Sequence, residues 1–406
     1  AESKPAQRVV FAPAQKNLRL QGSANALKRS FDMKPVTAGD IVSTTGHTRD
    51  PSGYRVTLGD FDAVARSPGD TLVFDSLGPG VHRLRLTGVA RNCASPWTVP
   101  GTITVPAGTS TRGIEVTCDS ALSDVLVISG TLAGLEQPLV LVRPTDGSTL
   151  GSLTRGSGVM DRRAAVSPDG RFVAFARLAI DPVTYTVVSM QVMKLRVADG
   201  TVMPLSEPVP WVSRLSWRPD GQELLATADL PAGYGIYRIP AEGGPPVRLA
   251  LAGSAWDVTA CANGQLLTTG TEAIDRRDPA GRLLGTWSWL SIDDPQSPAC
   301  SRDATQVAFE ASPGGRDISP YASAIFLIRA ASGTLEQLTP SGAQTQDPTF
   351  SPTGDRVAFT SLANGYWNTD VLYLEGQKKG LRYTVHGYGY EPDWAPDLDP
   401  DGTGQP

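Results

Sequence analysis

The residues that could carry chemistry are few, and they do not form a known catalytic pattern. The sequence has three histidines, and we place His47 and His82 in a strand-rich N-terminal segment and His386 in a linker near the other end. A Gly-x-Ser-x-Gly nucleophile elbow, a phosphate-binding glycine loop, a dinucleotide fingerprint and a Cys-x-x-Cys pair are all missing from the sequence. We therefore predict no catalytic residue, no cofactor and no metal site, and a protein that is not an enzyme.

One acidic motif near the C-terminus has the spacing of calcium ligands. The run Asp397-Leu398-Asp399-Pro400-Asp401-Gly402 resembles the first half of a calcium-binding loop. Such a loop is closed by a bidentate glutamate, which would fall beyond Pro406. We therefore interpret residues 401–406 as an acidic tail end, and calcium binding near Asp397 stays the alternative.

The composition excludes several classes of protein. The 406 residues include 42 glycines and 33 prolines, with 40% hydrophobic and 19% charged residues. The hydrophobic share is too high for a disordered chain, and the frequent glycine and proline exclude a coiled coil or a long helical bundle. No run of 18 apolar residues occurs, and the net charge of −5 argues against nucleic acid as a partner. These features favour an all-β protein with many short strands and no transmembrane segment.

The first 38 residues differ in charge from the rest. Seven lysines and arginines against Glu2 and Asp32 give residues 1–38 a net charge of +5, which leaves −10 for residues 39–406. Three prolines and the lack of a sustained periodicity predict an extended segment without a core of its own. We interpret it as a basic docking arm, with a flexible linker as the alternative. Its apolar clusters supply the candidate partner-binding residues Val9, Val10, Phe11, Leu18, Arg19 and Leu20.

Residues 39–120 have the pattern of a small β-sandwich. Alternating segments such as 54–58 and 81–86 are separated by proline- and glycine-rich turns, as in sandwiches with short strands. Cys93 and Cys118 lie 25 residues apart in this segment, and we predict a disulfide between them, with free thiols as the alternative. The start at Ala1-Glu2-Ser3 is typical of a mature exported protein, which is consistent with a disulfide.

A repeat occupies the remainder of the chain. An apolar strand, a turn such as Ser-Pro-Asp-Gly and a second apolar strand recur six times at intervals of 39 to 51 residues. The equivalent positions, here called the repeat anchors, are Val166, Trp217, Cys261, Cys300, Phe350 and Trp394. This interval is the length of a four-stranded propeller blade, and proline followed by glycine suits the tight turn. We predict a six-bladed β-propeller over residues 121–400.

The two ends of the repeat region complete each other. The sixth copy stops after its first strand, because only 12 residues follow Trp394. Segments 125–129, 139–143 and 150–154 match the missing second, third and fourth strands. We therefore predict that N- and C-terminal strands share one blade and close the propeller, which removes the open edges of the array.

Cys261 and Cys300 occupy equivalent positions in adjacent repeats. Equivalent strands of neighbouring blades are usually further apart than a disulfide permits. We interpret these cysteines as small buried apolar side chains, and a bridge between them is the alternative.

Two family resemblances follow from these motifs. The Ser-Pro-Asp-Gly turns followed by Val-Ala-Phe resemble the propeller repeats of the Tol-system periplasmic protein TolB, over about two-thirds of the chain. This resemblance implies a rigid interaction platform. The runs 50–56 and 77–84 resemble the immunoglobulin-like or PEGA-type modules of exported bacterial proteins, which implies a spacer or adhesive unit in front of the propeller.

Four aromatic residues near the end of the propeller are further candidates for partner binding. Tyr366 and Trp367 fall in a predicted loop, and Tyr388 and Tyr390 precede the last strand. Loops at one face of a propeller commonly form a binding surface, and exposed aromatic residues there serve as contact residues. Packing beneath the loops is the alternative.

The sequence therefore predicts a non-catalytic extracytoplasmic scaffold, periplasmic or extracellular, that associates peripherally with a membrane. Its expected partners are other protein subunits of a membrane complex. The layout is similar to that of the extrinsic propeller subunit of some bacterial photosynthetic reaction centre–light-harvesting complexes. The first alternative is a TolB-like propeller that binds a lipoprotein or a peptide. The second alternative is a propeller hydrolase or lyase.

Overall fold

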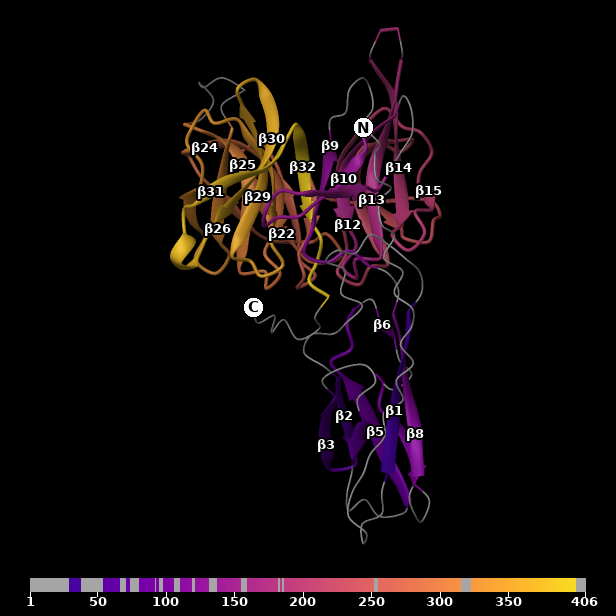
Figure 1. Cartoon of the computed structure of the whole chain (residues 1–406). Helices are drawn as coiled ribbons and strands as arrows, with labels where there is room; N and C mark the ends of the chain where they lie inside the picture. The colour runs from indigo at the N-terminus through magenta and orange to yellow at the C-terminus, as the bar shows by residue number, and fades with distance from the viewer. Residues whose placement is uncertain are drawn as a thin grey trace, which may run out of the picture. The chain divides into compact units, whose positions relative to one another are not determined.

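The computed structural model of the chain is all-β and divides into two compact units (Figure 1). The first unit comprises residues 1–121 with 398–406, and the second comprises residues 122–397. The structure describes residues 29–37, 54–65, 71–73, 80–91, 93–94, 98–105, 110–118, 121–130, 137–154, 159–181, 183–184, 186–251, 255–314 and 323–398. Within these ranges the only helix is the short 3-10 segment η1 (Gly376–Lys378), and none has the length and apolarity that crossing a membrane requires.

The described residues of the first unit form two four-stranded sheets. One has the order β4 (Thr71–Val73), β1 (Arg29–Thr37), β8 (Ser110–Cys118) and β6 (Cys93–Ala94), and the other has the order β3 (Phe61–Ala65), β2 (Tyr54–Leu58), β5 (Gly80–Thr87) and β7 (Gly101–Val105). Alternate residues of the second sheet are buried, among them Val56, Leu58, Leu84, Leu86 and Ile103. This alternation is the period of two expected of a sheet with one buried face. The immunoglobulin-like character of the unit stays a prediction.

The predicted boundary of the basic arm at residue 38 is corrected by strand β1. Arg29–Thr37 pairs in parallel with β8 along its whole length and antiparallel with β4. Ser30-Phe31-Asp32-Met33-Lys34 does alternate with a period of two, but the run is short and lies in a longer segment without a sustained period. The arm residues proposed to contact a partner, from Val9 to Leu20, lie outside the described residues.

The second unit contains six four-stranded antiparallel sheets, here called blades 1 to 6 (Figure 1). Blade 1 is β12 (Val159–Val166), β13 (Phe172–Ile180), β14 (Val187–Arg196) and β15 (Val202–Pro204), and blade 2 is β16 (Val212–Trp217), β17 (Glu223–Leu230), β18 (Gly233–Pro240) and β19 (Val247–Arg248). Blade 3 is β20 (Val258–Ala260), β21 (Leu266–Thr269), β22 (Ala273–Arg277) and β23 (Leu283–Ser288), and blade 4 is β24 (Ile292–Cys300), β25 (Gln306–Pro313), β26 (Ala324–Arg329) and β27 (Thr334–Gln337). Blade 5 is β28 (Thr345–Phe350), β29 (Arg356–Ala363), β30 (Tyr366–Tyr373) and β31 (Arg382–Gly387), and blade 6 is β32 (Gly389–Trp394), β9 (Leu126–Gly130), β10 (Leu139–Val142) and β11 (Thr149–Ser152).

Blade 6 is built from both ends of the repeat region, as the sequence predicts. Strand β32 pairs antiparallel with β9, and Trp394 lies opposite Leu126. The first strand of each blade contacts the first strand of the next, and β32 contacts β12. The six first strands therefore form a closed ring around a central axis, which leaves no unpaired sheet at either end of the array.

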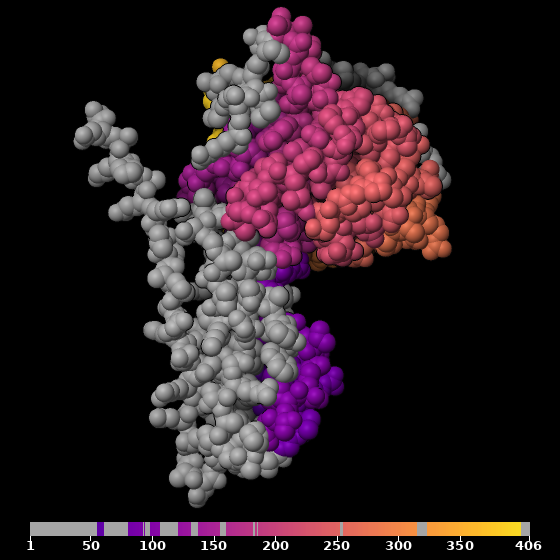
Figure 2. All heavy atoms as spheres, turned by 90° about the vertical axis from the view of Figure 1, so that its right-hand side faces the viewer, coloured from indigo at the N-terminus to yellow at the C-terminus, as the bar shows by residue number. Residues whose placement is uncertain are grey.

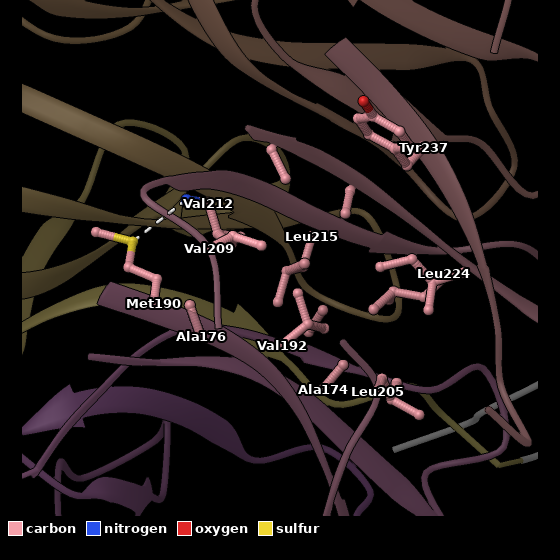
Figure 3. Close-up of a cluster of buried hydrophobic side chains, with 14 of the residues drawn as sticks. Ala174, Ala176, Met190, Val192, Leu205, Val209, Val212, Leu215, Leu224 and Tyr237 are labelled. Atoms are coloured by element: carbon pink, nitrogen blue, oxygen red, sulfur yellow. Dashed lines mark hydrogen bonds between the residues drawn. The ribbon is translucent and has the colours of Figure 1, made fainter. Parts of the chain in front are cut away.

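The core lies between neighbouring blades, which explains why the middle strands are apolar on both faces. Between blades 1 and 2, Ala174 and Val192 pack with Leu215 in one buried cluster (Figure 3). The sulfur of Met190 accepts a hydrogen bond from the backbone N–H of Val212 at 3.3 Å in the same cluster (Figure 3). Full burial of each large aliphatic side chain contributes about 1.5–3 kcal/mol.

The Ser-Pro-Asp-Gly motif closes the turn between the first and second strands of a blade. In blade 1 the hydroxyl of Ser167 accepts from the N–H of Phe172 at 2.9 Å and donates to Asp169 at 2.6 Å. Gly170 has a φ of +67°, the left-handed region that favours glycine. The serine repeats this role in blade 4, where Ser301 accepts from the N–H of Gln306 at 3.0 Å.

The two cysteine pairs have different outcomes. Cys261 and Cys300 form a disulfide with a Cα–Cα distance of 5.5 Å, so their interpretation as unpaired buried side chains is wrong. The reason is that the first strands of blades 3 and 4 contact each other near the axis, within the range that a disulfide spans. Cys93 lies opposite Cys118 in the register of β6 and β8 and is disulfide-bonded. Because the side chain of Cys118 lies outside the described residues, the pairing of Cys93 with Cys118 stays a prediction.

Candidate functional site

The first strands of several blades carry a β-bulge at an equivalent place. The pairing register shifts between Arg162 and Ala165 in β12, between Gln346 and Thr349 in β28, and between Tyr390 and Asp393 in β32. Strands β16 and β24 have register shifts in the corresponding region. Bulges of this kind redirect side chains out of the sheet ladder and are frequent beside functional sites.

The bulged residues adopt an uncommon backbone conformation. Arg163, Ser297, Asp347 and Glu391 have φ values between 50° and 55°, and each lies three residues before a repeat anchor. Non-glycine residues rarely adopt this region, so its repetition in four blades indicates that the fold imposes it. The side chains of these four residues meet those of other first strands near the axis. We call the four residues, together with the charged and hydroxyl side chains that contact them, the axial network.

Arg214 and Asp347 connect opposite sides of the ring. Arg214 belongs to blade 2 and Asp347 to blade 5, and 4.0 Å separates Nη1 of the arginine from Oδ1 of the aspartate. The hydroxyl of Ser297 in blade 4 donates to the same oxygen at 3.1 Å. Arg214 also donates to the carbonyl of Pro298 at 3.4 Å. The axis is therefore spanned by direct polar contacts at this level.

A second ion pair joins blades 1 and 6. Arg162 donates to both carboxylate oxygens of Glu391, at 2.6 and 3.2 Å, and the backbone N–H of Arg163 donates to it at 2.9 Å. The Arg162 guanidinium also lies 4.7 Å from the ring centre of Tyr390. Burial opposes ionisation of Glu391, but the charges of Arg163 and Arg162 outweigh it and hold the pKa of Glu391 below its usual value.

Three other carboxyl groups near the axis, those of Glu310, Asp347 and Asp393, are biased toward their protonated form. Burial, followed by the charge of Asp347, raises the pKa of Glu310 well above its usual range. Burial, followed by the charge of Glu391, raises the pKa of Asp347. Burial also raises the pKa of Asp393 to about 6, although the N–H of Val166 donates to it at 2.7 Å. Asp393 therefore changes its charge near pH 6, and the shifts of Glu310 and Asp347 run in the same direction.

Asp257 completes the network on the side of blade 3. It accepts from the hydroxyl of Ser213 at 2.8 Å and from the backbone N–H of Ser297 at 3.0 Å. One carboxylate thus ties the first strands of blades 2 and 4 to the start of blade 3. Shared acceptors of this kind fix neighbouring blades relative to each other.

One end of the propeller surrounds this network with exposed apolar side chains. We call it the hairpin end, because the second and third strands of each blade are joined there and each fourth strand leads there into the next first strand. Its exposed residues come from four of the blade-to-blade connections and three of the hairpins: Trp211, Trp256, Leu290, Tyr388, Tyr234, Tyr366, Trp367, Val183, Val187 and Val188. The β13–β14 hairpin, which carries the three valines, projects beyond the other blades (Figures 1 and 2). Clustered exposed aromatic and aliphatic side chains are typical of an interaction surface.

The structure brings some of the predicted aromatic residues together and separates others. Tyr366 and Trp367 lie in strand β30 rather than in a loop, because a tight turn at Asn364 and Gly365 precedes them. The rings of Tyr366 and Tyr388 meet edge to face, with 4.7 Å between their centres. Tyr390 instead lies half-buried against Arg162 and donates a hydrogen bond to Gln137.

The structure also places the predicted histidines and Asp397, except where they fall outside the described residues. His386 is in strand β31 of blade 5, not in a linker, and burial lowers its pKa. His82 is in β5 of the first unit, and His47 lies outside the described residues. Asp397 forms an ion pair with Arg302 at 3.4 Å. In the part of the chain that the structure describes, no three His, Cys, Asp or Glu residues are grouped to hold a metal ion.

Sequence reasoning missed the axial network, although the repeat contains its signal. Three residues before five of the six repeat anchors the sequence has a polar side chain: Arg163, Arg214, Ser297, Asp347 and Glu391. Polar residues at the same position of successive apolar strands indicate a shared polar environment. Extending the repeat alignment upstream of the anchors would have found them.

The closed ring of six blades places the chain in the class of β-propeller proteins. No protein-family model and no curated protein sequence matches it. Among solved structures, TolB from Acinetobacter baumannii is similar, with a TM-score of 0.55 and 15% identity over 79% of this chain and 81% of that one. A putative TolB from Agrobacterium tumefaciens has a TM-score of 0.49 and 16% identity over 68% of this chain and 94% of that one. At such identity the likeness shows the fold alone, and it confirms the TolB-like propeller.

Proposed function

We propose that this protein is a non-catalytic, extracytoplasmic propeller that binds another protein through its hairpin end. The observation that carries the proposal is the collection of exposed aromatic and aliphatic residues at that end. Solvent-exposed Trp and Tyr side chains are costly to leave in contact with water and are enriched among the residues that dominate protein interfaces. The three exposed valines of the β13–β14 hairpin, Val183, Val187 and Val188, extend the same surface away from the axis.

The axial network supports a role in positioning a partner. Arg162 and Arg163 are partly exposed, and each is held by the buried carboxylate of Glu391. Their orientation is therefore fixed before any partner arrives, which lowers the entropy lost on binding. Fixed charges beneath an apolar rim favour one orientation of the partner over others.

Site-specific photo-crosslinking tests this proposal. A photoreactive phenylalanine derivative replaces Trp211 or Tyr388 at the hairpin end in the full chain, and Leu283 serves as the control because it is exposed on the fourth strand of blade 3, away from that end. We expect a specific protein adduct from the first two positions and none from Leu283. Adducts from all three positions alike, or from Leu283 alone, would contradict the proposal.

The narrower proposals concern the identity of the partner. We infer a subunit of a membrane complex at its periplasmic face, with a photosynthetic reaction centre–light-harvesting complex as the specific case that the layout resembles. The TolB-like fold equally supports a lipoprotein or peptide as the partner. Mass spectrometry of the crosslinked adduct distinguishes them, because it identifies either integral membrane subunits or a lipoprotein.

A second candidate function is acid–base catalysis near the axis. Asp393 favours it, because burial raises the pKa of this residue to about 6. Glu310 favours it as well, because burial raises its pKa well above the usual range. A carboxyl group that titrates near neutral pH suits general acid catalysis of hydrolysis or elimination. Turnover of peptide or glycan substrates by the purified protein, lost in Asp393→Asn, would support this function over the binding role.

A further inference from the structure

A pocket of about 550 Å³ opens at the hairpin end between blades 2 and 3. Its walls come from residues 234–236 at the start of β18, Arg248 at the end of β19, and residues 249–251 and 255–256 beyond it. The volume lies in the range of pockets that hold a ligand or one or two large side chains of a partner. The pocket is separate from the axial network, since none of the network residues lines it.

One wall of the pocket is aromatic. The rings of Tyr234 and Trp256 are 6.4 Å apart between centres and are tilted by 50°. The Tyr234 hydroxyl donates to the carbonyl of Trp256 at 3.2 Å, which fixes the two residues relative to each other. Behind them, Ile236 and Leu249 belong to the buried apolar cluster between the two blades. A ring entering this pocket would find both an aromatic face and an aliphatic floor.

The polar element of the pocket is Arg248. Its guanidinium donates to the carbonyl of Tyr234 at 2.8 Å and to that of Ala232 at 3.4 Å. It lies across Gly235, where a Cβ atom would stand 2.7 Å from Nε, so the glycine provides the space that it occupies. Among the described residues its bonds are to these two carbonyls, and no carboxylate lies within ion-pair distance. By contrast, Arg282 one blade further along is paired with Asp278.

We propose that this pocket binds an acidic peptide segment of the partner protein, in which an aromatic side chain stands next to an aspartate or glutamate. The aromatic ring packs against Tyr234 and Trp256, and the carboxylate receives hydrogen bonds from Arg248. An arginine held in place but without a carboxylate is suited to a carboxylate from outside, because a charge-assisted pair is stronger than its bonds to neutral carbonyls. The inference deepens the proposed function and rests on it, since it assumes a protein partner.

The test compares two capped peptides that differ only in charge. Saturation-transfer NMR on the full chain measures the affinity of acetyl-Gly-Phe-Glu-Gly-amide and of its Gln counterpart at low ionic strength. We expect the Glu peptide to bind about fivefold more tightly, as an exposed charge-assisted pair allows. Arg248→Gln is expected to abolish this preference, and Arg282→Gln, which removes an exposed arginine elsewhere, is expected to retain it.

A second variant keeps the positive charge of Arg248 and changes its position. Gly235→Ala places a methyl group where the Arg248 guanidinium lies, at a backbone conformation that alanine accepts. We expect it to reduce the preference for the Glu peptide while the thermal melting temperature stays close to that of the unmodified chain. A normal preference in this variant would contradict the role assigned to the position of Arg248.

Several results would overturn the proposal. These are equal affinity for the two peptides, no binding of either, or a preference that survives Arg248→Gln. Binding of sodium decanoate or cellobiose in place of the peptides would assign the pocket to a lipid carboxylate or a sugar. If crosslinking at Trp211 and Tyr388 still captures a protein in that case, only the pocket proposal fails and the proposed function stands.

Discussion

Arg214 of blade 2 and Asp347 of blade 5 face each other across the propeller axis, with 4.0 Å between Nη1 and Oδ1. Each residue sits in or beside a β-bulge of its own strand. The contact therefore depends on the closure of all six blades, because the two residues belong to opposite sides of the ring. It links the repeat of the sequence to a specific charge arrangement in the fold.

Replacement of Arg214 by Met should destabilise the fold at neutral pH. Asp347 would lose a compensating charge while Glu310 and Glu391 remain near it. We expect the free energy of unfolding at pH 7 to fall by about 2 kcal/mol, as for removal of one partner of a partly buried pair. The loss should be smaller at pH 5, because more of Asp347 and Glu310 is then protonated. Urea denaturation at both pH values measures this, and equal losses at the two would contradict the account.

Asp393 should give the free energy of unfolding a negative slope with pH. Its pKa is raised to about 6 in the folded state, above a value of about 4 in the unfolded state, so the folded state retains a proton that the unfolded state loses between these values. The contribution of this group to the free energy of unfolding is complete below pH 4 and declines by about 3 kcal/mol as the pH rises through 6. Asp393→Asn keeps an acceptor for the N–H of Val166 and should abolish the slope.

The control for this pH dependence is Asp199. Hydrogen bonds from Arg196 lower the pKa of Asp199 to about 2. Its contribution to the free energy of unfolding is therefore complete above the pKa of the unfolded state and is lost only as the pH falls toward 2. Asp199→Asn should leave the slope between pH 4 and 7 unchanged. A slope that persists in Asp393→Asn would assign it to Glu310 or Asp347 instead.

The contact between the segment that precedes β9 and the first turn of blade 1 can be tested with a pair of glycines. Gly170 and Gly221 both have a φ of +67° in equivalent turns, but a Cβ at Gly170 would lie 2.2 Å from the carbonyl oxygen of Leu122, whereas one at Gly221 would meet nothing within 4 Å. Gly221→Ala should cost about 1 kcal/mol for the backbone conformation alone. Gly170→Ala should cost about 2 kcal/mol more, because it also breaks the 2.8 Å bond from the N–H of Leu122. Equal costs in thermal unfolding would show that this contact is absent.

The Cys261–Cys300 disulfide should contribute measurably to stability. It closes a loop with a sequence separation of 39 residues, for which chain entropy gives about 4 kcal/mol. We expect the double variant Cys261→Ser, Cys300→Ser to unfold at a lower urea concentration than the oxidised chain. Peptide mapping of the oxidised chain without a 261–300 cross-link would contradict the assignment.

The repeat made most of the propeller predictable from the sequence. Proline and glycine in the Ser-Pro-Asp-Gly turns fix each blade locally, and the truncated copy at Trp394 implies closure with the strands at 125–154. The disulfide between Cys261 and Cys300 could not be predicted in this way, because it depends on how closely two first strands approach. Strand β1 was missed for a different reason: the alternation over residues 30–35 is short and lies in a segment that otherwise lacks a sustained period.

The contacts of the axial network could not be predicted from the sequence repeat, and the reason is geometric. A period of two places Asp347 and Glu391 on a definite face of their strands, but the bulges at these residues change that face. The partnership of Arg214 with Asp347 further requires the ring to close. Arg248 gave no signal in the sequence, because its role depends on Gly235 and on the aromatic pair beside it.

The central claim, that the hairpin end binds another protein, is tested most directly by native separation of mild-detergent extracts followed by mass spectrometry. The samples are the unmodified chain, the variant Trp211→Ala with Tyr388→Ala, and the control Leu283→Ala with Leu284→Ala. The account predicts that the unmodified chain and the control migrate with partner proteins, whereas the hairpin-end variant migrates alone near 42.9 kDa. Migration of the unmodified chain alone, or of the hairpin-end variant with the same partners, would contradict it.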